Sequence, residues 1–212
     1  MIKKTSILGL LVLLGTVPAA AQTVDCLVAV VNGQAVTLTD LQVAQEFGLF
    51  AAGSKPAPGD PRLAVLEALI DRTVVLDAAR EPVTVGGPDI EAAVAAVRKA
   101  MGEAAFQAGL KKFDLREADL RPYLESRIRF EKVIATRFSA TSPVSRGDVE
   151  KYYRDVYTAA QKARGLAPSP LADVRAEIES QLRAASRTEK VAEWIRNLRA
   201  QARIRIDKDC LK

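Results

Sequence analysis

Apolar and polar positions near the two ends of the chain follow the pattern of β-strands. Residues 27–31 form a short apolar run, and residues 34–38 alternate polar and apolar side chains. Asn32 and Gly33 lie between these runs and favour a type I′ turn, because both residues tolerate a positive φ. Residues 203–207 alternate again, so the sequence predicts a hairpin near the start and a short strand at the end.

Between these strands the apolar residues recur every three or four positions, which is the pattern of amphipathic helices. Thr39 with Gln42, and Ser145 with Asp148, have the spacing of capping boxes that begin helices. Pro122 marks either a kink or a late start in the fifth helix. The predicted helices cover residues 40–50, 61–81, 88–101, 104–110, 114–138, 146–153 and 171–202. The fold class is therefore mainly helical.

The last predicted helix carries an almost unbroken apolar stripe over about 30 residues, which at 1.5 Å per residue is about 45 Å. The stripe has three interpretations: core packing, a face that pairs with another helix, or a substrate groove. A small domain cannot cover its whole length, so part of it needs the amino-terminal half, another subunit or a client chain as a partner. Its apolar residues are Leu171, Val174, Ile178, Leu182, Ala185, Val191, Ile195, Leu198 and Ala202.

Residues 1–21 have the organisation of a secretory signal peptide. Lys3 and Lys4 give a basic start, residues 7–17 are apolar, and residues 19–21 are alanines that suit cleavage. We therefore expect an exported protein whose mature chain begins at Gln22. No later apolar run reaches the roughly 18 residues of a membrane helix, so we expect no stable membrane insertion.

The composition removes most classes of enzyme site. The 212 residues include no histidine, which excludes Ser-His-Asp and Cys-His sites. The chain also lacks phosphate-binding and calcium-binding loop motifs. A site built on carboxylates or lysine stays open, but no motif points to one, and we expect no catalytic residue, metal or cofactor. Loss of the leader lowers the formal net charge from +5 to about +3, too little to predict nucleic-acid binding.

The two cysteines, Cys26 and Cys210, lie at opposite ends of the predicted mature chain. Disulfides persist in exported proteins, so the two are expected to pair with each other. Free or intermolecular thiols are the alternative. Two cysteines without histidine do not make a zinc site or an activated thiol.

Several segments resemble the SurA-type periplasmic chaperones. The first hairpin, the helix after Thr39 and the residues before the long fifth helix resemble the amino-terminal domain of that family. The end of the chain is similar to the segment that follows the family's parvulin domain. These features are carried by residues 27–37, 69–72 and 113–115, and by residues 170–178, 194–195 and 203–206.

The resemblance implies a SurA-like chaperone core over residues 22–157, a Pro/Gly linker over 158–170, and a final unit over 171–212 that packs back on the core. It implies that the amino-terminal helices pack around the last helix. It also implies that the final strand joins the first hairpin antiparallel, which brings Cys210 close to Cys26. The small hairpin would thus be completed by the carboxy-terminal strand.

The chain departs from this family at the linker. A parvulin prolyl-isomerase domain would lie between Tyr153 and Leu171, but about a dozen residues cannot form a domain. The resemblance therefore implies an ATP-independent periplasmic holdase for unfolded exported or outer-membrane precursors. Two alternatives stay open: a prolyl isomerase of the parvulin/SurA family with degenerate or absent activity, and a non-catalytic assembly or oligomerisation module.

Aromatic residues are the candidates for contact with unfolded clients, because large apolar side chains line grooves as well as cores. The expected partners are unfolded polypeptides, with a homo-oligomer as a further possibility and no nucleic acid. The candidate client-binding residues are Phe47, Phe50, Phe106, Phe113, Phe130, Tyr152, Tyr153, Tyr157 and Trp194.

Overall fold

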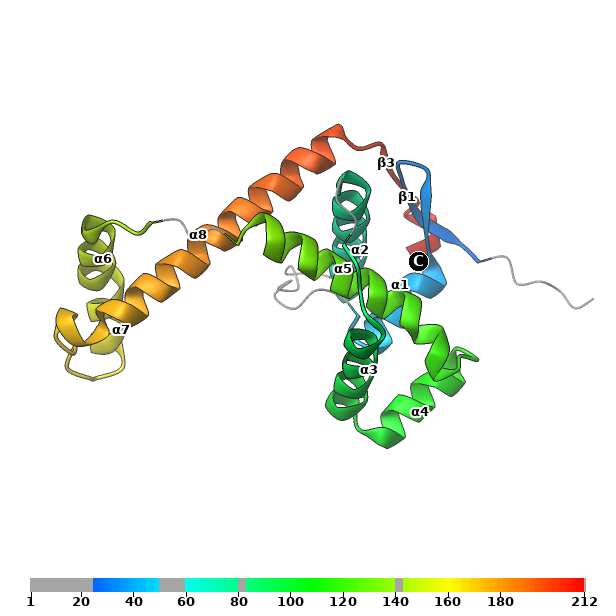
Figure 1. Cartoon of the computed structure of the whole chain (residues 1–212), viewed down its shortest axis with the longest axis horizontal. Coiled ribbons are helices and arrows are strands. Elements are labelled where there is room, and N and C mark those ends of the chain that lie inside the picture. The colour runs from blue at the N-terminus through cyan, green and yellow to red at the C-terminus, as the bar shows by residue number, and fades with distance from the viewer. Residues whose placement is uncertain (1–24, 50–59, 80–82, 140–142, 212) are drawn as a thin grey trace, which may run out of the picture.

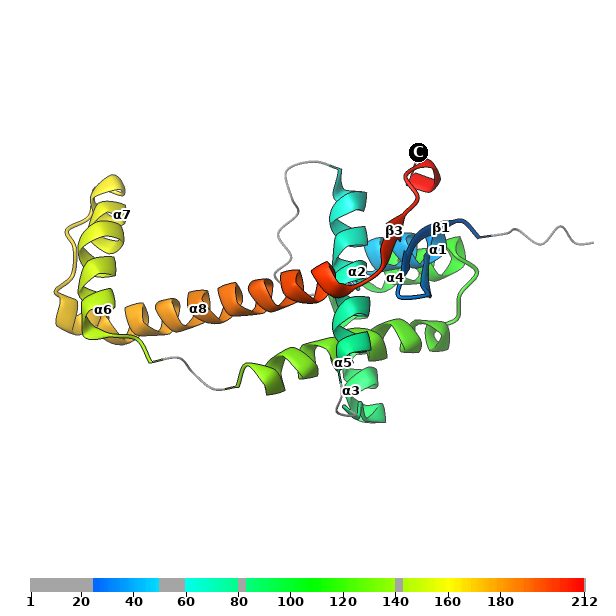
Figure 2. The same cartoon turned by 90° about the horizontal axis from the view of Figure 1, so that it is seen from above.

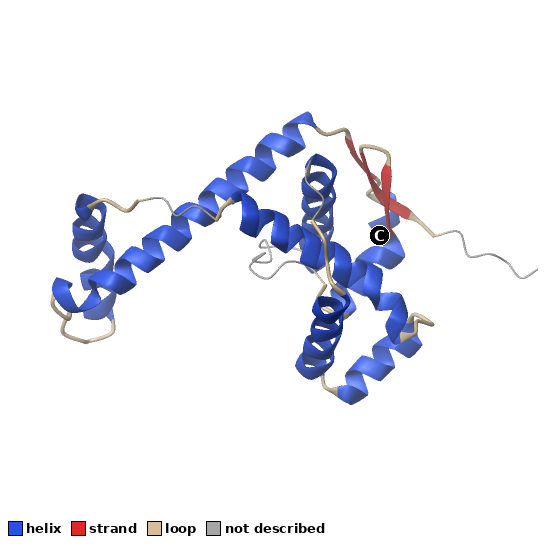
Figure 3. Ribbon diagram, viewed as in Figure 1, coloured by secondary structure: helices blue, strands red, loops and turns tan. Residues whose placement is uncertain are grey.

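Helices make up most of the structure, and one small sheet brings the two ends of the described chain together (Figures 1 and 3). The computed structural model describes residues 25–49, 60–79, 83–139 and 143–211. The predicted signal peptide at residues 1–21 and the candidate Phe50 lie outside these ranges. The prediction of a mainly helical fold with a small hairpin is confirmed.

The sheet has three antiparallel strands in the order β2-β1-β3. They are β1 (Leu27–Val31), β2 (Gln34–Thr37) and β3 (Ile204–Ile206). Asn32 and Gly33 have φ angles of 51° and 90°, which a type I′ turn requires. Ala29 lies opposite Ile206, so the last strand completes the hairpin as expected.

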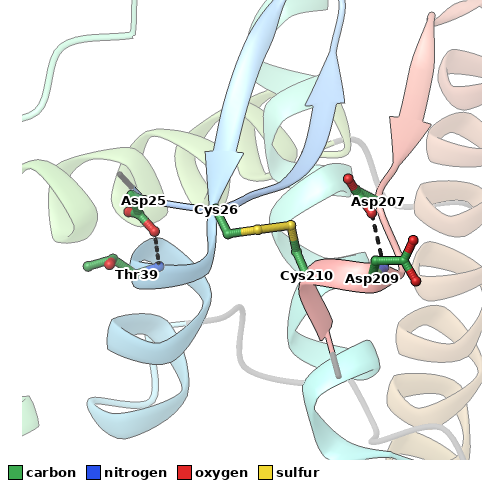
Figure 4. Close-up of a disulfide and its surroundings, with 6 residues drawn as sticks. All are labelled: Asp25, Cys26, Thr39, Asp207, Asp209 and Cys210. Atoms are coloured by element: carbon green, nitrogen blue, oxygen red, sulfur yellow. Dashed lines mark hydrogen bonds between the residues drawn. A yellow bond between two sulfur atoms is a disulfide. The ribbon is translucent and has the colours of Figure 1, made fainter. Parts of the chain in front are cut away.

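Cys26 and Cys210 form a disulfide beside this sheet, with their Cα atoms 5.9 Å apart (Figure 4). Cys210 lies in a short 3-10 helix, Asp209–Leu211, which follows β3. The antiparallel pairing of β1 with β3 brings the two cysteines together, so the predicted intramolecular pairing is confirmed. The link joins residues 184 positions apart and ties the end of the chain to the first strand.

Five helices and a short 3-10 helix follow the hairpin and hold the main core. Val28, Leu41, Leu66, Ile70 and Phe106 are buried in this core at 1% exposure or less. Leu198 and Ala202, near the end of the last helix, pack against the same core. The elements are α1 (Leu38–Glu46), α2 (Pro61–Ala78), α3 (Gly87–Met101), α4 (Glu103–Lys112), η1 (Glu117–Leu120) and α5 (Arg121–Arg137).

The helix start predicted at residue 40 is wrong by two residues, and the structure decides between the two alternatives left open at Pro122. Helix α1 begins at Leu38, because Thr37 is its N-cap and forms a capping box with Asp40. The predicted capping pair Thr39 and Gln42 therefore lies inside the helix. Helix α5 begins at Arg121, so the late start is confirmed and the kinked helix from residue 114 is not formed, because Pro122 lacks an N–H donor and fits a first turn.

A second, smaller lobe forms around the beginning of the last helix. It contains α6 (Arg146–Tyr152), a π-helical turn η2 (Tyr153–Tyr157), α7 (Thr158–Ala163) and the first turns of α8 (Leu171–Gln201). Val149, Val174 and Ile178 are its buried centre. The predicted linker over 158–170 thus begins with a helix, and only residues 164–170 are non-helical.

Helix α8 joins the two lobes (Figures 1 and 2). At 1.5 Å per residue its 31 residues extend over about 46 Å. Its beginning packs in the small lobe, its end packs against α2, and residues 183–190 between them are half-exposed or exposed. The expectation that the amino-terminal helices pack around α8 is therefore wrong for its middle, where the neighbouring helices reach only one side.

Candidate functional site

An open groove of about 910 Å³ lies between α8, α5 and α2. Phe130 and Ile134 of α5 and Val191 and Ile195 of α8 give it apolar walls. All four side chains are half-buried, because nothing in the described chain packs into the groove from the open side. The full lining comprises Ala68, Asp71, Phe130, Glu131, Ile134, Ala184, Arg187, Thr188, Val191, Ala192, Ile195, Arg196 and Arg199.

Helix periodicity places these side chains on facing surfaces. Phe130 and Ile134 are four residues apart, as are Val191 and Ile195, so each pair lies on one side of its helix. Ala184 and Ala192 share the groove face of α8 and have short side chains. The alternation of large apolar side chains with alanines leaves space that larger residues would fill.

An ion-pair cluster holds α8 to α2 at the groove. Arg199 of α8 donates hydrogen bonds to Asp71 and Glu67 of α2, each at 2.6 Å. Burial raises the pKa of Asp71 above its ordinary value, although the hydrogen bond from Arg199 opposes this shift. The Asp71 carboxylate is therefore costly in its ionised form and depends on the guanidinium beside it.

An aromatic contact joins the end of α5 to α8. Phe138 follows the last turn of α5 and packs edge-on against Trp194, with ring centroids 5.6 Å apart. The guanidinium of Arg137 lies 4.5 Å from the centroid of the Trp194 ring, within the range of a cation–π interaction. Together with the Arg199 cluster, this contact fixes the position of α8 relative to α5 and α2.

A buried arginine lies on α2 directly after Asp71. Arg72 is 5% exposed and donates a hydrogen bond to the carbonyl oxygen of Leu49. Burial, together with the nearby charge of Arg127 and against the opposing effect of Glu131, lowers the pKa of Arg72 to about 10. Arg72 is still charged at neutral pH and links α2 to the residues that follow α1.

The predicted client-binding aromatics divide among separate places. Phe47 and Phe106 belong to the main core, 3% and 0% exposed, with ring centroids 5.8 Å apart. A client cannot reach them in this structure, so they are removed as candidates. Phe113 packs half-buried against the same core, with the Lys112 ammonium 5.1 Å from its ring centroid.

Among the described candidates, Phe130 lines the groove, whereas Trp194 packs against Phe138 and is not part of the groove lining. The three tyrosines belong to the small lobe instead. Tyr153 and Tyr157 stack with ring centroids 5.5 Å apart, and the Tyr152 hydroxyl hydrogen-bonds Gln181 of α8 at 2.9 Å. The structure therefore does not bring the eight candidates that it describes into one site.

Reasoning from aromatic residues missed most of the groove. Ala68, Ala184, Arg187 and Arg196 line it, and none of them is among the candidates predicted from the sequence. One signal was present: the apolar stripe of the last helix has no large residue between Leu182 and Val191. A stripe that loses its large side chains midway indicates where the helix is not packed against a core.

The part of the chain that the structure describes contains neither a metal-binding cluster nor a membrane-spanning helix. In that part, no group of three or more Cys, Asp or Glu side chains is placed to hold a metal ion. None of the described helices is long and apolar enough to span a bilayer.

No model of a known protein family matches the sequence, and no curated protein matches it. The groove is therefore the feature of the described chain that bears on function.

Proposed function

We propose that the protein is an ATP-independent holdase that binds unfolded exported polypeptides, including outer-membrane precursors, in the groove between α5 and α8. The observation that carries this proposal is an apolar groove of about 910 Å³ that the described chain leaves open. Apolar side chains exposed in a groove release free energy when another chain covers them, about 25 cal/mol per Å² of apolar surface. An unfolded polypeptide supplies such surface without a specific sequence.

The arrangement of the lobes supports this function. Helix α8 leaves residues 183–190 accessible and holds a lobe at each end. A client chain is thus able to lie along the middle of α8 without displacing either core. The predicted leader, the disulfide and the resemblance to SurA-type chaperones all agree with work in an exported, oxidising compartment.

One further candidate function has an observation in its favour. The exposed middle of α8 is also suited to pair with the same helix of a second copy, as an assembly module requires. Molecular mass in solution separates the two functions. A holdase stays the same size on dilution and binds clients, whereas an assembly module forms oligomers through α8 and leaves clients unbound.

The test is suppression of aggregation of a denatured outer-membrane barrel protein, at stoichiometric amounts and without nucleotide. We expect the protein to suppress light scattering, and we expect Val191→Asp to lose most of this effect because it places a charge in the apolar wall. The matched control is Leu63→Asp, which changes an apolar side chain 46% exposed on α2 outside the groove. Leu63→Asp should behave like the unchanged protein.

Three results would contradict the proposal: no suppression at several-fold excess, equal loss in both variants, or full activity in Val191→Asp. A refolding assay limited by prolyl isomerisation addresses the enzyme alternative. A holdase leaves that slow phase at its uncatalysed rate, whereas an isomerase accelerates it.

A further inference from the structure

We propose that the groove selects a particular class of client segment: apolar residues in extended conformation with acidic residues on either side. This inference rests on the proposed holdase function and adds the chemistry of the ligand. It is carried by the distribution of charge around the groove. The α8 wall carries positive charges, two of which have no acidic partner within the described ranges. The opposite wall carries acidic residues that are paired with arginines of the protein.

The charged residues on the groove face of α8 all have the same sign. They are Arg187, Arg196 and Arg199. The acidic residues of α8 lie outside the groove lining, and they are Asp173, Glu177, Glu179, Glu189 and Glu193. A client chain lying against α8 therefore meets only positive side chains on that wall.

The opposite wall has acidic residues, but each is held by an arginine of the protein. Asp71 accepts a hydrogen bond from Arg199 at 2.6 Å. Glu131 lies 3.5 Å from the Nε atom of Arg127, one turn earlier on α5. Arg187 and Arg196 are exposed and form no ion pair with another residue in the described ranges. The groove thus has two uncompensated positive charges beside apolar walls.

The spacing of these two arginines indicates the geometry of the ligand. Arg187 and Arg196 are nine positions apart, which is about 13.5 Å along the axis of α8 and half a turn around it, so they border the groove at opposite edges of its α8 wall. An extended chain advances about 3.3 Å per residue, so a segment that crosses this wall obliquely needs two carboxylates about four or more residues apart. The residues between them lie over Val191 and Ile195.

Arginine is suited to this task because its planar guanidinium donates paired hydrogen bonds to a carboxylate. A client segment that covers the groove excludes water from the guanidinium groups, which lowers the local dielectric and strengthens the attraction relative to open water. A neutral apolar segment would gain only the burial of its side chains. A basic segment would also be repelled by both arginines.

The experiment measures binding of fluorescent peptides to the whole oxidised protein by anisotropy. The probe has Asp-Leu-Phe-Leu-Asp at its centre, and two matched peptides replace both aspartates by Asn or by Lys. We expect the Asp peptide to bind roughly fivefold or more tightly than the Asn peptide, and the Lys peptide to bind most weakly. Raising the salt from about 0.1 M to about 1 M should remove most of the difference, because it shortens the screening length.

The variant R187Q/R196Q should bind the Asp and Asn peptides equally, with the affinity for the Asn peptide unchanged. Its control is R146Q/R154Q, which removes the same net charge from exposed positions of the small lobe. This control should keep the preference for the acidic peptide. Both variants change exposed side chains, and circular dichroism checks that the fold is retained.

Equal binding of the Asp and Asn peptides by the unchanged protein would overturn the inference and leave the holdase proposal standing. A preference that survives in R187Q/R196Q, or disappears in R146Q/R154Q, would also overturn it, since overall charge would then be responsible. If none of the peptides binds and aggregation is not suppressed, the proposed function fails as well.

Discussion

The guanidinium of Arg199 lies 2.6 Å from the carboxylate of Asp71 and couples the last helix to α2 at the groove. Both residues line the groove, so this ion pair helps to set its width as well as the packing of α8. The Asp71 side chain is 32% exposed, and burial raises its pKa. A partly buried carboxylate stays ionised at low cost only while a cationic partner, here the Arg199 guanidinium, lies close to it.

Replacement Arg199→Ala should lower the free energy of unfolding by about 1–2 kcal/mol at pH 7, because Asp71 loses a charged hydrogen-bond donor. The loss should shrink as the pH falls through the raised pKa of Asp71, since the protonated side chain no longer needs a cation. Urea denaturation at several pH values measures both effects. Arg203→Ala, an exposed change in the same region, is the control; a pH-independent loss in Arg199→Ala would contradict the account.

The disulfide should be the largest single contribution to stability in the chain. Cys26 and Cys210 close a loop of 184 residues, for which the chain-entropy model gives about 5 kcal/mol. The double variant C26S/C210S should therefore unfold at a clearly lower denaturant concentration. A thiol assay on the denatured, unreduced protein should detect no free thiol, and two titratable thiols would contradict the pairing.

Tyr123 should titrate late and make the protein sensitive to alkali. Burial raises the pKa of Tyr123 to about 12, with the negative charge and hydrogen bond of Asp40 adding to the shift. The folded protein keeps this proton while the unfolded chain releases it near 10, so stability should fall as the pH rises from about 10 to 12.

The change Tyr123→Phe removes the ionising hydroxyl and tests this assignment. It should abolish the last phase of the phenolate absorbance titration and flatten the alkaline loss of stability. A last phase that persists in Tyr123→Phe would assign the late titration to another residue. Circular dichroism at neutral pH checks that Tyr123→Phe keeps the helical fold.

Two phenylalanines should separate stability from client binding. Phe106 is fully buried, so Phe106→Ala should cost about 3–5 kcal/mol of stability. Phe130 is half-buried in the groove wall, so Phe130→Ala should cost only about 1–2 kcal/mol but weaken client binding several-fold. Thermal denaturation and peptide anisotropy measure the two quantities. Equal client affinity in Phe130→Ala and the unchanged protein would contradict the role of the groove.

Local signals account for the parts of the fold that the sequence predicted well. Asn32-Gly33 determines a turn, and Asp60 followed by Pro61 begins a helix, because each depends on backbone preferences of adjacent residues. The error in the start of α1 had a local cause of the same kind. Thr37 and Thr39 both fit an N-cap, and only the end of β2 selects Thr37, whose backbone is extended.

The groove was not predictable in the same way. Periodicity shows that Val191 and Ile195 share one face of a helix, but it does not show what covers that face. The distance between α8 and the helices α2 and α5 depends on contacts between residues far apart in sequence. Examples are Arg199 with Asp71 and Phe138 with Trp194. The sequence pattern does not distinguish Phe47 from Phe130, yet Phe47 is buried in the core and Phe130 lines the groove.

The most direct measurement of the central claim is photo-crosslinking from the groove to an unfolded client. A benzoylphenylalanine at Ala184, an exposed position in the groove lining, should crosslink to a denatured outer-membrane barrel protein without nucleotide. The control is the same group at Ala200, which is exposed on nearly the opposite side of α8 and outside the groove. Crosslinking from 184 and not from 200 is the predicted result. Equal crosslinking from both positions, or none from 184, would contradict the groove as the client site.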